Sequence, residues 1–296
     1  MTLERTIKPT LTPFLLNAGD TINLTLSRGK AWNMTLLGST AAITKHGTPP
    51  YNDSGHYRGN VAVYEFSAQV EINGQPHTFR REVGSQASFY QPWVVDGVTI
   101  WFDASAAAFT HHGGFMEEKD WRQSYICCPS RLTRWAVQEE GLGICPETLC
   151  DWFPNPKRPL DIRDCYTGED CWMGPYNGGS THCGLDINMA IGTPLFAPFA
   201  LDTQYLFHNI ASNFGNNRWI GQRLWPDGSL WQIQAHHVVE VTVPPHTPLR
   251  AGQAYASAAG IAYGATPHSH FLWRISEQGG TYLLDPWILF ERTRPS

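Results

Sequence analysis

Polar and apolar residues alternate through much of this 296-residue chain, and glycine, asparagine and proline residues interrupt the alternation at short intervals. In an extended strand successive side chains point to opposite faces, so a period of two predicts β-strands rather than helices. The alternation runs from about Thr21 to Asp103 and returns after about Cys171. The sequence therefore predicts a mainly β protein with two strand-rich parts.

The first strand-rich part predicts an N-terminal β-sandwich, which we assign to residues 1–108. A hairpin is predicted near its centre, because Asn73-Gly74 follows Ile72 and both residues readily adopt the positive φ of a type I′ turn. The strands expected in this part are Thr21–Leu26, Trp32–Ile43, Asn60–Ile72 and Val94–Phe102.

A cysteine-rich segment, residues 109–170, is expected to connect the two strand-rich parts. Six of the seven cysteines lie between residues 127 and 171, a density that favours disulfides over buried free thiols. Short loops flanked by turn residues predict two bridges, Cys145–Cys150 and Cys165–Cys171, with at least one thiol left over. A short helix is expected over Ser130–Glu139.

Composition excludes two classes of partner. Only 16% of the residues are charged, the net charge is −5, and no long run of Lys or Arg occurs, so the basic surface of a nucleic-acid-binding protein is missing. No apolar stretch approaches the ~20 residues that a membrane-spanning helix needs.

The cysteine content favours an exported protein, secreted or in the periplasm or cell envelope. The first residues lack a signal peptide, so we expect that the signal has been removed.

Two histidine motifs in the second strand-rich part offer metal ligands. His182 precedes Asp186 by four residues, and His268 precedes His270 by two. Both spacings are even, so on β-strands each pair shares one face of the sheet. Imidazole nitrogens with one carboxylate suit Zn²⁺, and three protein ligands leave a position for a reactive water. The same alternation turns Cys183 away from the face that carries His182.

The order of these motifs resembles that of the lysostaphin/LytM-type zinc endopeptidases, which cut the peptide stems or cross-bridges of bacterial cell walls. The resemblance covers about Cys171 to Phe290 and does not extend to the first 150 residues. It implies that residues 171–296 form an antiparallel β catalytic domain of the duplicated hybrid motif type. The succession that carries it is His182, Gly184-Leu185-Asp186-Ile187, Gly192-Thr193-Pro194-Leu195, Ala197-Pro198, His237, Val241, Val243, Gly252-Gln253 and His268-Ser269-His270-Phe271.

Site residues follow from this resemblance residue by residue. It implies that His182, Asp186 and His270 bind Zn²⁺ and that His268 and His237 are catalytic. Family members carry a Tyr-x-His segment where this chain has Ala235-His236-His237, so the tyrosine is missing and two histidines compete for one role. Counting back from Val241, Val243 and Gly252 favours His237. Alternation would point His236 to the opposite face, so a register error of one residue would exchange the two.

The resemblance thus implies a zinc-dependent endopeptidase that hydrolyses peptide bonds of peptidoglycan or of another peptide. A non-catalytic or regulatory cell-wall-binding module with the same fold is the alternative. Five aromatic residues either stack on the substrate or pack in the core, and core packing is favoured for each: Trp172, Tyr176, Trp219, Trp225 and Trp231.

Overall fold

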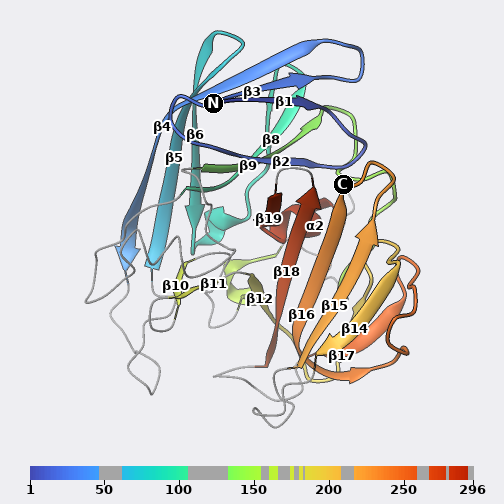
Figure 1. The fold of residues 1–296 in the computed structure, drawn as a ribbon. Coiled ribbons are helices and arrows are strands. Elements are labelled where there is room, and N and C mark those ends of the chain that lie inside the picture. The colour runs from blue at the N-terminus through green and yellow to red at the C-terminus, as the bar shows by residue number, and fades with distance from the viewer. Residues whose placement is uncertain are drawn as a thin grey trace. The chain divides into compact units, whose positions relative to one another are not determined.

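The protein is mainly β, as the alternation predicts (Figure 1). The computed structural model describes residues 1–46, 62–105, 133–154, 160–165, 174–176, 180–182, 184–207, 217–258, 267–277 and 280–292. Within these residues there is one α-helix, α2 (Trp287–Arg292), and there are two short 3-10 helices, η2 (Gln86–Ser88) and η3 (Ile162–Asp164).

The chain divides into two compact units. The first comprises Met1–Pro146 with Met173–His182, and the second comprises Glu147–Trp172 with Cys183–Ser296.

The first unit contains two sheets. The five-stranded sheet has the order β1 (Thr2–Thr6), β3 (Thr21–Thr25), β4 (Ala31–His46), β5 (Ala62–Ile72) and β6 (Gln75–Val83). The four-stranded sheet has the order β2 (Thr12–Leu16), β9 (Thr133–Glu139), β8 (Val98–Ser105) and β7 (Trp93–Val95). Phe79 of the first sheet contacts Trp93 and Trp135 of the second, with ring centroids 5.1 and 5.5 Å apart. A two-stranded ribbon, β10 (Gly174–Tyr176) with β11 (Ser180–His182), belongs to the same unit.

The hairpin predicted at Asn73-Gly74 is confirmed. Ile72 at the end of β5 pairs with Gln75 at the start of β6, and only two residues connect them. Asn73 has a φ of 48° and Gly74 a φ of 79°, so both central residues adopt the positive φ of a type I′ turn. Local sequence alone specifies this turn, because few residues tolerate that backbone.

The helix predicted over Ser130–Glu139 is wrong. Its described part, Thr133–Glu139, is strand β9, which pairs with β2 on one side and β8 on the other. Six of its seven residues are buried. A strand buried on both faces has no polar alternation, and such a segment cannot be told from a buried helix by its periodicity.

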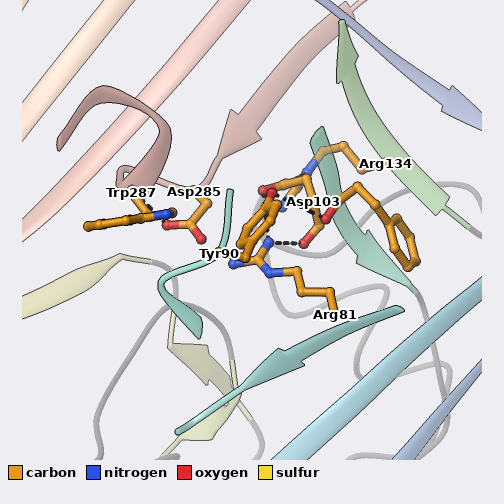
Figure 2. Close-up of polar contacts among 7 residues, drawn as sticks. Arg81, Tyr90, Asp103, Arg134, Asp285 and Trp287 are labelled. Atoms are coloured by element: carbon orange, nitrogen blue, oxygen red, sulfur yellow. Dashed lines mark hydrogen bonds and ion pairs between the residues drawn. The ribbon is translucent and has the colours of Figure 1, made fainter. Parts of the chain in front are cut away.

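An ionic cluster is buried between strands of the first unit (Figure 2). The Arg81 guanidinium donates to the backbone carbonyl of Asp103, and its Nη1 lies 3.4 Å from Oδ1 of the same residue. Arg134 Nε donates to the other carboxylate oxygen of Asp103. The side chains of Arg81 and Asp103 are fully buried, and Arg81 lies over the ring of Tyr90, 4.9 Å from its centroid. The cluster links β6, β8 and β9 by charge as well as by packing.

The second unit is built on one eight-stranded sheet. Its main path is β12 (Leu185–Asn188), β18 (His268–Glu277), β16 (Leu230–Val241), β15 (Asn217–Leu224) and β14 (Thr203–Phe207), all antiparallel. Three further strands attach to this path: β13 (Pro194–Phe196), β17 (Ala254–Ala258) and β19 (Gly280–Leu284). Helix α2 follows β19, and the Asp285 carboxylate accepts a hydrogen bond of 2.8 Å from the backbone N–H of Trp287 at its start (Figure 2).

Aromatic side chains fill one face of this sheet. Phe271 of β18 packs against Trp152 and against Phe290 of α2, with ring centroids 4.8 and 5.4 Å apart. Trp231 contacts Trp273 at 4.9 Å on the neighbouring strand. Three of the five aromatic residues for which the sequence leaves cleft or core open lie in the core, since they are at most 2% exposed: Trp219, Trp225 and Trp231. The side chains of Trp172 and Tyr176 lie outside the described part of the structure. The opposite face carries the histidines.

The predicted Cys145–Cys150 bridge is not formed, although the structure describes both residues. Cys150 has a free thiol. The two cysteines belong to different units, and each is held by its own surroundings: the Ile144 carbonyl next to Cys145 accepts from Leu11, whereas the N–H of Cys150 donates to Pro198. Short sequence spacing therefore does not by itself predict a disulfide. Cys171, the predicted partner of Cys165, lies outside the described residues.

In the part of the chain that the structure describes, no helix has the length and apolar character required to cross a membrane.

Candidate functional site

A row of polar side chains crosses four strands of the second unit. Asp186 on β12 pairs with His270 on β18, His270 pairs with His236 on β16, and His236 pairs with Arg218 on β15. Residues directly opposite in an antiparallel sheet point to the same face. Two carboxylate oxygens, two imidazoles and one guanidinium thus share the face opposite the aromatic core.

Asp186 and His270 form the tightest contact of this row. Oδ1 of Asp186 lies 2.5 Å from Nδ1 of His270, and Oδ2 lies 3.6 Å from Nε2 of His268. These three residues are 4 to 9% exposed. The even spacing of His268 and His270 on β18 places both imidazoles on one face, as the sequence predicts. Asp186 is therefore the carboxylate around which the predicted site is assembled.

Gly184 makes room for the imidazole of His270. A Cβ atom at position 184 would lie 2.4 Å from Nε2 of His270 and 2.3 Å from the carbonyl oxygen of Phe271. Any side chain there would displace either the ring or the strand. Gly184 is part of the family-like succession, but its steric role becomes visible only when β12 and β18 are paired.

A β-bulge brings both adjacent histidines of β16 to the site. Asn217 pairs with Val238 whereas Arg218 pairs with His236, so His237 is the extra residue on β16. His237 has a φ of 61°, which a non-glycine residue rarely adopts. Its ring centroid lies 4.7 Å from that of His268, and the ring of His236 lies 4.8 Å from that of His270. The prediction that His236 and His237 face opposite ways is wrong, because a bulge interrupts strict alternation.

The surroundings of His236 favour the neutral form of its imidazole. Burial of the imidazole, and after it the electrostatic effects of His270 and Arg218, lower the pKa of His236 well below its ordinary value. Its Nε2 lies 3.2 Å from Oε1 of Gln234, two residues earlier on the same face. A neutral imidazole can accept a proton, which a protonated ring cannot.

The third predicted ligand, His182, ends strand β11, where its residue pairs with Gly174. Its side chain lies outside the described part of the structure, as does Cys183. Within the described residues, no group of three His, Cys, Asp or Glu side chains has the geometry of a metal site. The ligand role of His182 stays a prediction.

The described donors fit zinc in their chemistry. Asp186 and His270 present an oxygen and a nitrogen to one another, and carboxylate oxygen with imidazole nitrogen is a ligand combination found at zinc sites. His268 adds a further imidazole beside the same carboxylate. The arrangement therefore supplies two of the three predicted ligands side by side, with additional imidazoles in contact with them.

Comparison with solved structures finds peptidases. The chain is similar to the catalytic domain of the antimicrobial peptidase lysostaphin from Staphylococcus simulans, at 23% identity and a TM-score of 0.32, over 41% of this chain and 86% of that one. Another lysostaphin structure is matched over 49% of its length, at 23% identity and a TM-score of 0.34. A zinc-containing peptidase from Vibrio cholerae is matched at 12% identity and a TM-score of 0.32, over 88% of this chain and 86% of that chain.

These matches include lysostaphin, which the sequence resemblance names. No protein-family model matches the sequence, and no curated protein matches it. The TM-scores of these matches are all below 0.5.

Proposed function

We propose that this protein is a zinc-dependent endopeptidase whose metal is held by His182, Asp186 and His270. The observation that carries the proposal is the contact of Asp186 with His270 and His268 on the polar face of the sheet. A carboxylate that is buried together with imidazoles is a candidate for a functional site. The order of these residues along the chain also supports the proposal, because it resembles that of the lysostaphin/LytM-type zinc endopeptidases.

Bound zinc would polarise the carbonyl of the cleaved bond and make a bound water acidic. His268 and His237 are the proposed catalytic residues. Their rings contact one another, so a proton taken up by either ring stays beside the reacting atoms. Neutral imidazoles can accept the proton of the attacking water, and protonated ones can stabilise the oxyanion that follows. Since no glutamate contributes to the described cluster, proton transfer falls to the histidines.

The proposed substrate is the peptide part of peptidoglycan, at its stems or cross-bridges, and the proposed location is extracellular or in the cell envelope. Both proposals come from the sequence resemblance. The packing of the second unit is compatible with them, because the aromatic core lies behind the sheet and leaves the opposite face to the polar row. A substrate bound on that face would meet histidines rather than tryptophans.

Digestion of purified peptidoglycan tests the proposal. The zinc-loaded protein is expected to release new amino groups without new reducing sugar ends, and 1,10-phenanthroline is expected to stop the release. His268→Ala serves as the inactive control. Mass spectrometry of the released fragments identifies the bond. If intact protein binds peptidoglycan and zinc but releases nothing, the alternative of a non-catalytic cell-wall-binding module replaces the endopeptidase.

A further inference from the structure

Arg218 ends the polar row on the side away from Asp186. It pairs with His236 across β15 and β16, and on its other side it pairs with Phe207 of the edge strand β14. Arg218 is exposed, and the side chain of Phe207 is also exposed, to 59%. A guanidinium and an aromatic ring therefore lie side by side on the same face as the histidines, at the end of the row where the sheet meets solvent.

The charge of Arg218 is not neutralised by an ion pair within the described residues, and no carboxylate contacts it there. Arg223, five residues later on the same strand, is different: its guanidinium binds both Glu147, at 2.9 Å, and Asp202, at 2.8 Å. The only carboxylate of the row, that of Asp186, lies on β12, two strands beyond the strand of His236, and it contacts His270. Among the described residues, no carboxylate therefore competes with an outside anion for Arg218.

Distance sets where such an anion can lie on a bound peptide. Neighbouring strands are about 4.8 Å apart, so Arg218 and His270 are about 10 Å apart at their Cα atoms. An extended peptide advances about 3.3 Å per residue, so that distance corresponds to about three residues. A carboxylate within about three residues of the reacting bond can therefore reach the guanidinium, which can bind both of its oxygens.

We infer that Arg218 forms a carboxylate-binding subsite, so that the protein prefers peptides with an acidic side chain or a free carboxylate on one side of the cleaved bond. This inference rests on the proposed function for the site at which the peptide reacts. It names the class of substrate, and it makes Arg218 a specificity-determining residue rather than a catalytic one. Phe207 supplies an apolar surface beside the bound carboxylate.

A peptide series with one acidic residue tests the subsite. Neutral Gly/Ala hexapeptides, acetylated and amidated at their ends, carry a single Glu at each position in turn, and the matched peptides carry Gln there. Affinity is measured by fluorescence anisotropy on the full-length His268→Ala protein, so that turnover does not interfere. At the best position the Glu peptide is expected to bind about fivefold more tightly than its Gln partner, the size of an exposed ion pair. The preference should shrink as salt is raised from about 0.05 to about 0.5 M.

Matched variants identify the residue responsible. Arg218→Gln is expected to bring the Glu-to-Gln ratio to about one, and Arg218→Lys to retain part of it. Arg250→Gln removes the same charge from another exposed position of the second unit and is expected to keep the full ratio. Equal affinities at every position, discrimination that survives Arg218→Gln, or no measurable binding would overturn the inference. Binding that depends on Arg218, without cleavage by the zinc-loaded wild-type protein, would instead sink the proposed function and leave the subsite standing.

Discussion

Asp186 and His270 face one another across β12 and β18, with Oδ1 of the aspartate 2.5 Å from Nδ1 of the histidine. This contact joins two motifs that lie 84 residues apart in the chain. His268 lies on the same face of β18, and its Nε2 is 3.6 Å from Oδ2 of the same carboxylate.

Metal binding should depend on both partners of this contact. Asp186→Ala and His270→Ala are each expected to lose stoichiometric zinc after dialysis, because each removes one proposed ligand. His182→Ala should behave in the same way. Metal analysis by mass spectrometry provides the measurement, and His246→Ala, which removes an exposed histidine of the same unit, should keep its zinc. Full zinc content in His182→Ala would reject that residue as a ligand.

The second histidine of the bulge should act on the reaction and not on the metal. His237→Ala is expected to retain zinc but to lower kcat by about 10² or more, since its ring contacts that of His268, the other proposed catalytic residue. Zinc content and peptide hydrolysis are measured on the same preparation. His236→Ala provides the comparison. If His236→Ala abolished turnover while His237→Ala were silent, the catalytic role would belong to His236.

The histidine pair shows where alternation fails as a guide. The sequence predicts the shared face of His268 and His270, because their strand is regular. At His237 the prediction fails, because one extra residue on β16 with a φ of 61° turns two consecutive side chains to one site. The local sequence does not predict this bulge, since histidine is not a residue that requires positive φ. It depends on how β15 and β16 are paired.

The other predictions from sequence are also correct where neighbouring residues decide the structure and wrong where residues distant in the chain decide it. The Asn73-Gly74 hairpin is correct because its two residues by themselves favour the turn. Strand β9 is missed because its burial comes from neighbours distant in sequence. The Cys145–Cys150 bridge is predicted from spacing, but the unit boundary passes between the two residues. Arg218 joins the site through strand order, which no motif encodes.

Adding a methyl group at Gly184 should disturb the site directly. Gly184→Ala places a Cβ 2.4 Å from the His270 ring, so the ring or β12 must move. The free energy of unfolding is expected to fall by about 1–3 kcal/mol, and zinc affinity should fall with it. Gly38→Ala is the control, because a Cβ there meets no atom within 4 Å. Chemical denaturation and zinc titration give the two readouts. A Gly184→Ala protein with wild-type zinc affinity would show that the glycine is not needed for the imidazole.

The buried ionic cluster of the first unit should be a stability device separate from the site. Asp103→Ala leaves the charges of Arg81 and Arg134 buried without the carboxylate that they share, and we expect the free energy of unfolding to fall by about 3–5 kcal/mol. Urea denaturation measures the loss. Glu71→Gln, an exposed change in the same unit, should alter stability little. Unchanged stability in Asp103→Ala would mean that the cluster contributes nothing to folding.

Glu139 gives the first unit a pH dependence of known sign. Its carboxylate accepts hydrogen bonds from the backbone N–H of Ser27 at 2.8 Å and from the Ser27 hydroxyl at 2.9 Å, and the backbone bond is the main cause that lowers the pKa of Glu139. A group whose pKa is lower in the folded state stabilises the protein above its unfolded pKa, and that stabilisation disappears as pH falls through the folded value.

Wild type should therefore be more stable than Glu139→Gln at pH 7, and the difference in stability should disappear in acid, below the ordinary range of a glutamate pKa. Ser27→Gly, which keeps the backbone donor, should retain most of the difference. Denaturation curves recorded from pH 7 down to about pH 3 test the sign, since a gap between wild type and Glu139→Gln that stayed constant over this range would show that the carboxylate is not held by Ser27 in solution.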